Sequence, residues 1–424
     1  MKIYIETYGC WLNKADSEIV ASMLRDLGHE ITHDLSEADV AIINTCAVRA
    51  DTEMKIAKRL HELEEWRAKS GNRRIIVLGC LAKARPAFVA YNAPSASIIG
   101  PNALNSIVNA LKERIIDVGP DKRSNLKLPN YYGSKRFTIP IAVGCLGSCA
   151  YCIMPISRGK LSSYPPESIL KLFNEAVSQG AKEIYLVAQD LAAYGLDIGY
   201  RLPLLLQELL KCEGDYMVRL GMMEPSTLML IADEMKKLYL NPHVYKYLHL
   251  PLQSGSNKIL KLMNRRYTAE DFIRLVEDFR SSIDDLFFAT DVIVGLPMED
   301  EEDFEHTCKV IERLKPDKVH VARYAMRPFT KAASMPQVPD HVKKERSRLM
   351  VEMVKEITLS RNLRYVGEEV EVLLTDIAPR EGLAGRMMNY RPVIVKCDDK
   401  EMLWRRVTVL IEEAKHHVLI GRII

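Results

Sequence analysis

The feature that most constrains the fold of this chain is a repeated alternation of short apolar segments with amphipathic segments. Six segments rich in β-branched and aromatic residues are separated by stretches whose apolar residues recur at helical spacing. The expected strands span residues 138–144, 183–189, 216–222, 245–251, 287–295 and 318–325. Such an alternation predicts parallel strands joined by helices, here a partial (β/α)6 barrel. In sheets of this kind the loops after the strands carry the chemistry.

A shorter series of the same kind occupies residues 1–115. The expected strands span residues 2–9, 38–45 and 73–79. The expected helices between them span residues 15–28 and 51–69. This alternation predicts an α/β domain with a doubly wound parallel sheet. Residues 116–137 are polar, basic and interrupted by proline and glycine, so we interpret them as a linker to a central domain, residues 138–361.

The last part of the chain has a third pattern. A long helical segment at residues 341–367 follows a break marked by Pro336 and Pro339. Beyond it, short apolar segments alternate like antiparallel strands with no helix between them, at residues 370–377, 392–397, 404–413 and 416–424. This pattern predicts a small OB-like β-barrel domain over residues 362–424.

Size and composition indicate a multi-domain protein without membrane spans. At 424 residues the chain exceeds the roughly 250–300 residues at which a single core stops growing. No apolar run approaches the ~18 residues of a membrane span. The chain starts on a strand-like segment without a basic and apolar leader, so we expect a cytoplasmic location. The formal net charge of +3 allows a nucleic-acid substrate but does not demand one.

Nine cysteines, an odd number, argue against a disulfide framework and for metal or redox use of some of them. Cys145, Cys149 and Cys152 lie in the loop after the first strand of the central series, with no fourth cysteine or histidine nearby. A structural zinc site closes with four protein ligands, so this triplet is a poor zinc site. A [4Fe–4S] cluster held by three cysteines leaves one iron able to chelate a ligand such as S-adenosylmethionine (SAM). Zinc and buried unreactive thiols remain alternatives.

A second group of three cysteines is dispersed in the sequence. Cys10, Cys46 and Cys80 each lie at the C-terminal end of an expected strand of the first domain. The carboxyl ends of parallel strands face one edge of the sheet, so these cysteines can converge on one point. The sequence therefore predicts a second metal site with three protein ligands, against the alternative of three unrelated core cysteines.

Both cysteine groups resemble the motifs of a known family. The spacing Cys145-x3-Cys149-x2-Cys152, with Tyr151 before the last cysteine, resembles the signature of the radical SAM enzymes. The segments TYGCWLNKADSE, NTCAV and LGCLA are similar to the N-terminal motifs of the methylthiotransferases within that group. GRMMNYRPVIV, residues 385–395, is similar to the RNA-binding TRAM domain of the same family. The resemblance covers nearly the whole chain in the expected order.

The resemblance implies two [4Fe–4S] clusters, SAM as radical source and methyl donor, and sulfur insertion at C2 of a modified adenine. Segments such as GCLGSCAYCIMPISRGK and HLPLQSGSNKIL look most like the archaeal and eukaryotic branch. That branch converts N6-threonylcarbamoyladenosine at position 37 of tRNA to its 2-methylthio derivative. Alternatives are the branches that act on isopentenyladenosine in tRNA or on a ribosomal protein aspartate. A non-catalytic iron–sulfur RNA-binding protein is an alternative of another class.

The implied partners are a tRNA anticodon loop, a sulfur donor and an electron donor such as flavodoxin or ferredoxin. The candidate SAM ligands are polar residues at the ends of expected barrel strands, namely Gln189, Glu224, Gln253, Ser254 and Asp291. Any of them could instead cap the following helix. The candidate RNA-backbone contacts are the C-terminal arginines Arg386, Arg391, Arg405 and Arg406, with simple solvated side chains as the alternative.

Some further residues carry weaker expectations. Arg158 could pair with a carboxylate or phosphate, or form a surface ion pair, and we interpret His249 as a core histidine. Ala188 and Met298 depart from the family pattern, since many relatives have glycine there. The remaining cysteines, Cys212, Cys308 and Cys397, are expected to be structural.

Overall fold

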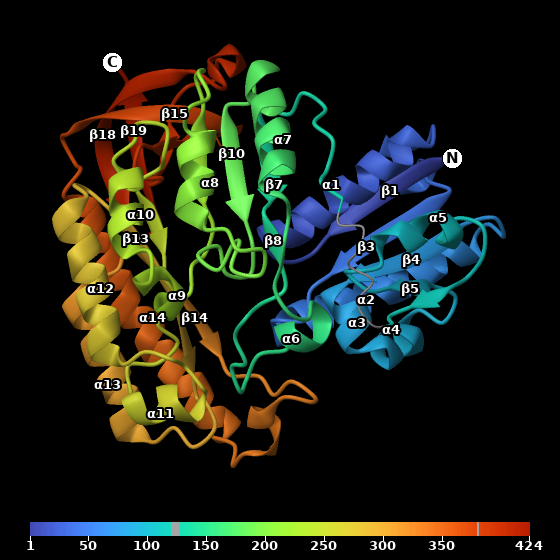
Figure 1. Ribbon diagram of the computed structural model, residues 1–424, viewed down its shortest axis with the longest axis horizontal. Helices are drawn as coiled ribbons and strands as arrows, with labels where there is room; N and C mark the ends of the chain where they lie inside the picture. The colour runs from blue at the N-terminus through green and yellow to red at the C-terminus, as the bar shows by residue number, and fades with distance from the viewer. Residues whose placement is uncertain (120–126, 380) are drawn as a thin grey trace.

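The computed structural model describes residues 1–119, 127–379 and 381–424. Figure 1 shows an N-terminal α/β sheet in blue beside a central set of strands and helices, with a red C-terminal barrel at one end of the central strands. The expected fold class is confirmed: two parallel α/β parts are followed by a small closed β-barrel. Among the described residues, no helix is long and apolar enough to cross a membrane.

The N-terminal sheet is parallel throughout, in the strand order β2-β1-β3-β4-β5-β6. Its strands are β1 (Lys2–Thr7), β2 (Glu30–Thr32), β3 (Val40–Thr45), β4 (Arg74–Gly79), β5 (Ser97–Ile99) and β6 (Ile116–Asp117). Its helices are α1 (Trp11–Asp26), α2 (Ala50–Ala68), α3 (Cys80–Ala84), α4 (Pro86–Asn92) and α5 (Ile107–Ala110). All residues of the central strand β3 are buried, as expected for a sheet covered on both faces. The topology reverses between β1 and β3, where ligands bind in such sheets.

The central part contains two three-stranded parallel sheets, β11-β10-β7 and β12-β13-β14, which a parallel bridge between Val218 and Val244 connects. Its strands are β7 (Arg136–Pro140), β8 (Ala142–Val143), β9 (Ser162–Ser163), β10 (Glu183–Val187), β11 (Met217–Leu220), β12 (Tyr247–His249), β13 (Phe287–Val294) and β14 (Lys318–Arg323). Its helices are α6 (Met154–Ser157), α7 (Pro166–Ser178), α8 (Leu202–Leu209), α9 (Pro225–Met229), α10 (Ala232–Tyr239), α11 (Asn257–Leu262), α12 (Ala269–Ser282), α13 (Glu301–Leu314) and α14 (Asp340–Leu363). The six strands β7, β10, β11, β12, β13 and β14 form the expected partial barrel, a half-barrel.

Local sequence explains where the helices of the outer layer begin. Thr268 and Asp271 form a capping box at α12, and Asp300 and Asp303 form another at α13. Each box satisfies backbone N–H groups that the first helical turn leaves unpaired. The apolar sides of these helices pack against the strands and thereby fix the positions of the strand ends.

The C-terminal barrel closes in the order β15-β16-β17-β19-β18. Its strands are β15 (Glu369–Ile377), β16 (Leu383–Met387), β17 (Pro392–Val395), β18 (Arg406–Lys415) and β19 (Val418–Ile423). The sequence predicted four of these strands and missed β16, whose adjacent small residues Ala384 and Gly385 hide the apolar pattern. Glycine is required there, because a Cβ on Gly385 would lie 2.5 Å from the carbonyl oxygen of Leu373.

The segment interpreted as a linker also contains structure at both ends. Residues 116 and 117 form β6, and β7 begins at residue 136. Two-residue strands have no periodicity to read, and they form here because the neighbouring strand offers unpaired backbone groups. Of the rest of the segment, residues 120–126 lie outside the described residues.

Candidate functional site

Three cysteines meet at the carboxyl edge of the N-terminal sheet. Cys10 follows β1 and precedes α1, Cys46 follows β3, and Cys80 opens α3 directly after β4. The sulfur atoms of Cys10 and Cys80 each lie 3.8 Å from Oδ1 of Asn13. A Cβ added to Gly9 would come within 2.9 Å of the Cβ of Cys46, so the loop that carries Cys10 lies directly against Cys46. The structure thus brings together three cysteines that are 70 residues apart at most.

Arg158 of the central part reaches into this site. Its side chain is fully buried; Nε donates to the sulfur of Cys80 at 3.2 Å, and Nη2 donates to Oδ1 of Asn13 at 2.9 Å. Nη1 donates to Oδ1 of Asp16 at 3.2 Å, and burial raises the pKa of Asp16 even though Arg158 opposes this shift. Arg158 therefore pairs with a carboxylate as expected, but the alternative of a surface ion pair is wrong, because the guanidinium is enclosed by both domains.

The second triad lies in the loop after β8. The backbone N–H of Gly147 donates to the sulfur of Cys145 at 3.2 Å, and the N–H of Met154 donates to the sulfur of Cys152 at 3.4 Å. A Cβ on Gly147 would lie 3.3 Å from the sulfur of Cys145 and 3.7 Å from that of Cys149. Glycine at this position therefore leaves the space between two of the sulfurs free.

Arg265 supplies positive charge to this triad, and sequence reasoning did not identify it. Its side chain is 5% exposed, and Nη1 donates to the sulfur of Cys149 at 3.2 Å. Burial raises the pKa of Cys145 to about 11 and that of Cys152 to about 12. Both thiols are therefore protonated at neutral pH unless a metal displaces the proton, as metal ions do when they bind cysteine.

In the part of the chain that the structure describes, neither triad holds its three sulfur atoms within 4.8 Å of one another, as ligands of a single zinc ion would be. Among the described residues, the one group of three potential ligand atoms within 4.8 Å of one another is His249, Asp291 and His320. Sulfur atoms around one zinc ion stand about 3.8 Å apart, given Zn–S bonds of about 2.3 Å in a tetrahedron. The sulfurs of neither triad are drawn together to that extent, which agrees with a larger cluster of several irons.

Two of the candidate SAM ligands have unpaired acceptors. The side-chain oxygens of Gln189 and Gln253 are buried without a hydrogen-bond partner among the described residues. Gln253 also has a φ of 69°, a left-handed conformation that its neighbours impose. A buried acceptor without a partner is unfavourable unless a ligand satisfies it, so these two amides fit a ligand with an ammonium or hydroxyl group.

The other strand-end candidates have protein partners. Glu224 caps α9 by accepting from the backbone N–H groups of Ser226 and Thr227. Ser254 is buried, with its hydroxyl 3.3 Å from the hydroxyl of Thr307, and the cap of α11 is Ser256. Both side chains are therefore largely occupied by roles within the fold.

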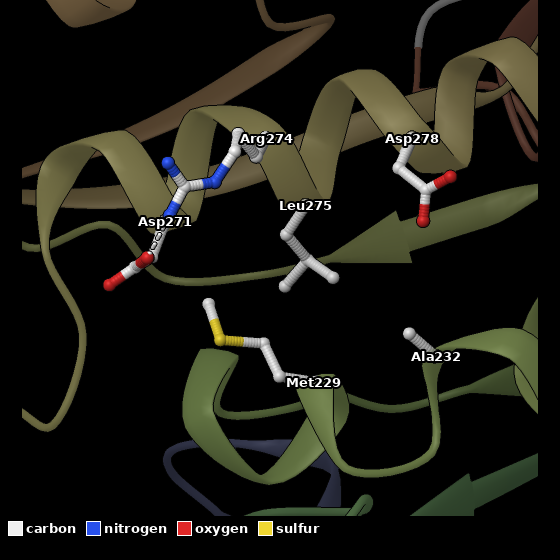
Figure 2. A pocket seen from close by; sticks show the side chains of 6 residues that line it. All are labelled: Met229, Ala232, Asp271, Arg274, Leu275 and Asp278. Atoms are coloured by element: carbon white, nitrogen blue, oxygen red, sulfur yellow. Dashed lines mark hydrogen bonds and ion pairs between the residues drawn. The ribbon is translucent and has the colours of Figure 1, made fainter.

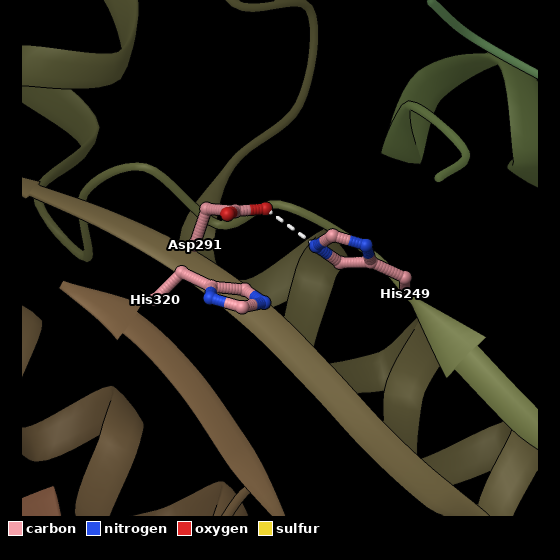
Figure 3. A group of neighbouring side chains, drawn as sticks. All are labelled: His249, Asp291 and His320. Carbon is pink, nitrogen blue, oxygen red and sulfur yellow. Dashed lines mark hydrogen bonds and ion pairs between the residues drawn. The ribbon is translucent and has the colours of Figure 1, made fainter. Parts of the chain in front are cut away.

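Asp291 forms part of a third group, shown in Figure 3 with His249 and His320. Nε2 of His249 lies 2.7 Å from Oδ2 of Asp291. The side chain of His249 is 15% exposed and pairs with Asp291 on the inner side of the barrel, so it is satisfied as expected without being fully enclosed. His320 was not singled out from the sequence, because a lone histidine in an apolar strand carries no distinguishing signal.

The four C-terminal arginines have different environments. Arg391 is 1% exposed and pairs with Asp317, which removes it from any surface that RNA can reach. Arg406 is exposed but pairs with Asp215 and Glu371. Arg386 lies 4.7 Å from the ring centre of Tyr390, and Arg405 is exposed.

A surface hollow on the outer helical layer is unrelated to these groups. Figure 2 shows it between α9, α10 and α12. It is lined by Met229, Ala232, Asp271, Arg274, Leu275 and Asp278. It contains none of the cysteines and none of the strand-end polar groups.

Comparison with known families divides the chain in the same order as the structure. Residues 2–100 match the "Uncharacterized protein family UPF0004", residues 139–311 match the Radical SAM superfamily, and residues 363–424 match the TRAM domain.

Full-length relatives extend this result. The chain is 41% identical over 404 residues to a "Probable threonylcarbamoyladenosine tRNA methylthiotransferase" of Pyrococcus abyssi, with 93% of each chain covered. A protein of the same name from Methanocaldococcus jannaschii is 40% identical, with 89% of this chain and 88% of the relative covered. A "tRNA-2-methylthio-N(6)-dimethylallyladenosine synthase" of Caldicellulosiruptor saccharolyticus is 37% identical, with 99% and 92% covered.

Among solved structures, the radical SAM methyltransferase TsrM from Kitasatospora setae has a TM-score of 0.58 at 15% identity, with 78% of this chain and 75% of that chain covered. This likeness shows the fold alone. The fold, the Cys145 motif and the superfamily match define the class of protein, a radical SAM enzyme, whose superfamily uses a [4Fe–4S] cluster and SAM. Within that class, the chain belongs to the radical SAM methylthiotransferase family. The expected enzyme class and family are confirmed.

Proposed function

We propose that this protein is a tRNA methylthiotransferase that converts N6-threonylcarbamoyladenosine at position 37 to its 2-methylthio derivative. The observation that carries the proposal is the pair of cysteine triads, with the buried side chain of Arg158, six residues after Cys152, donating to the sulfur of Cys80 in the other triad. The names of the full-length archaeal relatives support the choice of tRNA substrate.

The central triad is proposed to hold the radical SAM cluster. Cys145, Cys149 and Cys152 provide the three ligands, and Arg265 places a guanidinium beside the sulfur of Cys149. A hydrogen bond from a charged donor such as this guanidinium is stronger than one from a neutral donor. When bound, the cluster and SAM supply one-electron chemistry and a methyl group, which protein side chains alone do not provide.

SAM binding is assigned to the strand ends next to this triad. Gln189 and Gln253 offer the unpaired amide oxygens described above, which suit the amino group and ribose hydroxyls of SAM. Asp291, Glu224 and Ser254 also stay candidates, although Glu224 caps α9 and the hydroxyl of Ser254 contacts that of Thr307. Asp190 adds to this framework by accepting from the N–H of Glu224 at 2.9 Å.

A second [4Fe–4S] cluster is proposed for Cys10, Cys46 and Cys80. Three sulfur ligands leave one coordination position for a sulfur species, which gives this site the task of sulfur delivery. Asn13 connects the loops that carry Cys10 and Cys46, since its Nδ2 donates to the carbonyl oxygens of Tyr8 and Thr45. The sulfur donor, an electron donor such as flavodoxin or ferredoxin, and the cytoplasmic location stay predictions.

For the RNA, the TRAM domain supports contact with the anticodon stem-loop, where unstacked bases are accessible to proteins. Arg386 and Arg405 are the proposed backbone contacts. Arg391 is excluded by its burial, and the ion pairs of Arg406 reduce the charge that it can offer to a phosphate.

The test is nucleoside mass spectrometry of total tRNA from cells that make threonylcarbamoyladenosine but lack this enzyme. Expression of the protein is expected to produce 2-methylthio-threonylcarbamoyladenosine. Cys10→Ala and Cys149→Ala are expected to abolish the product, whereas Cys397→Ala, a half-buried cysteine outside both triads, retains it. A methylthio product on dimethylallyladenosine alone would contradict the substrate assignment. An unchanged tRNA pool would reject it altogether.

A further inference from the structure

The inner face of the half-barrel carries a group of polar side chains that neither triad uses. Register partners in parallel strands lie on the same face, as do residues two apart along one strand. His249 pairs with Ala289, Ala289 pairs with Lys318, and Asp291 pairs with His320. These side chains therefore share one face of β12, β13 and β14. Figure 3 shows His249, Asp291 and His320 directed toward one another.

Positive charge predominates around this face. The residue Lys318 is exposed as a whole, but its ammonium group is partly desolvated. This desolvation, and then the neighbouring Arg386 and Arg219, lower the pKa of the ammonium. Burial also lowers the pKa of His320 to about 4; the carboxylate of Asp291 opposes this shift, whereas Lys318, His249 and Arg49 add to it. His320 is therefore neutral at physiological pH and keeps one N–H for donation.

Arg219 extends the positive charge toward the starts of the strands. Its guanidinium lies 4.7 Å from the ring centre of Tyr247, 5.2 Å from that of Tyr390 and 5.4 Å from that of Tyr185. The side chain is 7% exposed, and its Nε has no hydrogen-bond partner in the described part of the chain. Within that part, Lys318, Arg49 and Arg219 form no ion pair with a carboxylate. Asp291 is the carboxylate on this face that attracts Lys318 and Arg49, and an anionic ligand shares their charges with it.

Two histidines and a carboxylate at this spacing also resemble the ligands of a divalent metal ion. The neighbouring charges decide against that interpretation. Lys318 lies on the same face as His320, two residues along β14, and its ammonium repels a bound cation, although Asp291 attracts one. The carboxylate of Asp291 already accepts a hydrogen bond from His249 at 2.7 Å, which reduces its attraction for a cation. The environment therefore favours an anion.

We propose that Arg49, Lys318 and His320 form a carboxylate-binding patch that receives the acidic end of the N6-threonylcarbamoyl group. The inference rests on the proposed function, which supplies the substrate. A threonyl group joined through its nitrogen has a free carboxylate, a hydroxyl and a urea N–H. Arg49 and Lys318 attract the carboxylate, His320 donates one hydrogen bond to it, and Asp291 accepts from the hydroxyl or the urea N–H.

The position of the patch suits this role. Arg49 follows Cys46 by three residues and so belongs to the domain that holds the N-terminal triad. Asp291 accepts through its backbone oxygen from the N–H of Gln253 at 2.8 Å, so the patch also adjoins a proposed SAM contact. A substituent bound here keeps its adenine next to residues of both proposed cofactor sites.

The patch also accounts for a preference for threonylcarbamoyladenosine over dimethylallyladenosine. A dimethylallyl group has no charge and no hydrogen-bonding group, so it leaves Arg49 and Lys318 without a partner. Sites built to hydrogen-bond a polar substituent discriminate strongly against an analogue that lacks it. Loss of one charged partner from a partly exposed pair is expected to weaken binding roughly tenfold.

The experiment measures binding of three fluorescent anticodon stem-loop RNAs to the reconstituted full-length enzyme. The RNAs carry threonylcarbamoyladenosine, its carboxyl methyl ester, or unmodified adenosine at the same position. The variants are Lys318→Met, Arg49→Met and His320→Phe. Lys309→Met is the matched control, because Lys309 lies on the outer helix α13 with a side chain that is 67% exposed.

The wild-type protein and Lys309→Met are expected to bind the free acid roughly tenfold more tightly than the ester. Lys318→Met and Arg49→Met are expected to lose this preference while they bind the unmodified RNA as the wild type does. Equal weakening of all three RNAs would assign the residues to phosphates and overturn the inference. A stoichiometric divalent metal in the wild-type protein that His320→Phe loses would overturn it as well.

Methylthiolation of the same RNAs separates the two proposals. If the wild-type enzyme modifies the free-acid RNA but shows no preference for the acid over the ester, the patch is refuted and the proposed function stands. If the wild-type enzyme modifies neither RNA, the proposed function itself is refuted, and the inference is refuted with it.

Discussion

Replacement of Arg158 with methionine is expected to destabilise the protein strongly. The substitution keeps most of the side-chain volume but removes a charge that is completely buried between two domains. It leaves the carboxylate of Asp16, whose side chain is 3% exposed, without its partner. Removing one partner of a buried ion pair typically costs about 3–5 kcal/mol. For a domain of this size that corresponds to a decrease in Tm of roughly 6–20 °C.

Tryptophan fluorescence during thermal unfolding measures this loss of stability at the contact between the two domains. Trp11 packs edge-on against Tyr185 of the central part, with ring centres 4.5 Å apart, so its emission reports separation of the two domains. The control is Arg201→Met, since Arg201 pairs with Glu234 and both side chains are more than 40% exposed. Exposed pairs contribute about 0–1 kcal/mol, so this variant is expected to unfold close to the wild type.

A second substitution tests the cause of the loss. The double variant Arg158→Met with Asp16→Leu removes both charges and is expected to recover most of the stability, because no unpaired buried charge remains. If Arg158→Met unfolds at the same temperature as the Arg201→Met control, the buried pair does not hold the two domains together and the reasoning is refuted.

Three other substitutions test separate features. Gly144→Ala is expected to abolish iron loading of the central triad, because φ of Gly144 is +77° and the new Cβ would lie 1.9 Å from a backbone oxygen. The control is Gly133→Ala, where φ is +80° and the space around the new Cβ is open. This variant is expected to lose only about 1–2 kcal/mol of folding stability and to keep its iron. Burial raises the pKa of Asp190 from 3.8 to about 7, so the folded protein holds a proton that the unfolded chain releases. This contribution to stability is complete below about pH 4 and is lost as the pH rises to 7, and Asp190→Asn is expected to flatten the pH dependence of the urea midpoint in that window. Met298 has a φ of 63°, so Met298→Gly is expected to stabilise the fold by about 0.5–1 kcal/mol in urea unfolding, and a loss of stability would contradict this.

The sequence was most informative where long apolar strands alternate with helices. The six barrel strands and the strand ends that carry Cys10, Cys46 and Cys80 follow from that alternation. The strands β2, β5 and β6 were missed because segments of two or three residues have no measurable period. Such short strands form only after a longer neighbour offers its backbone groups.

Contacts between distant segments could not be read from the sequence. Arg158 and Asp16 are 142 residues apart, and Arg265 lies 116 residues from Cys149. Nothing in their local context distinguishes these side chains from surface arginines. Arg391 shows the opposite error, since a basic residue in an RNA-binding module proved to be enclosed beside Asp317.

The C-terminal barrel covers the starts of the central strands, and this has a consequence for synthesis on the ribosome. Leu373 of the barrel packs with Tyr245, Tyr247 and Phe287 of the central part. The barrel itself closes only when β19 pairs with both β17 and β18. Because these strands follow the central strands in the sequence, the nascent chain exposes an aromatic surface of the kind that chaperones bind until β19 has been made. A chain that stops before β19 therefore keeps this surface uncovered and open to the quality-control machinery.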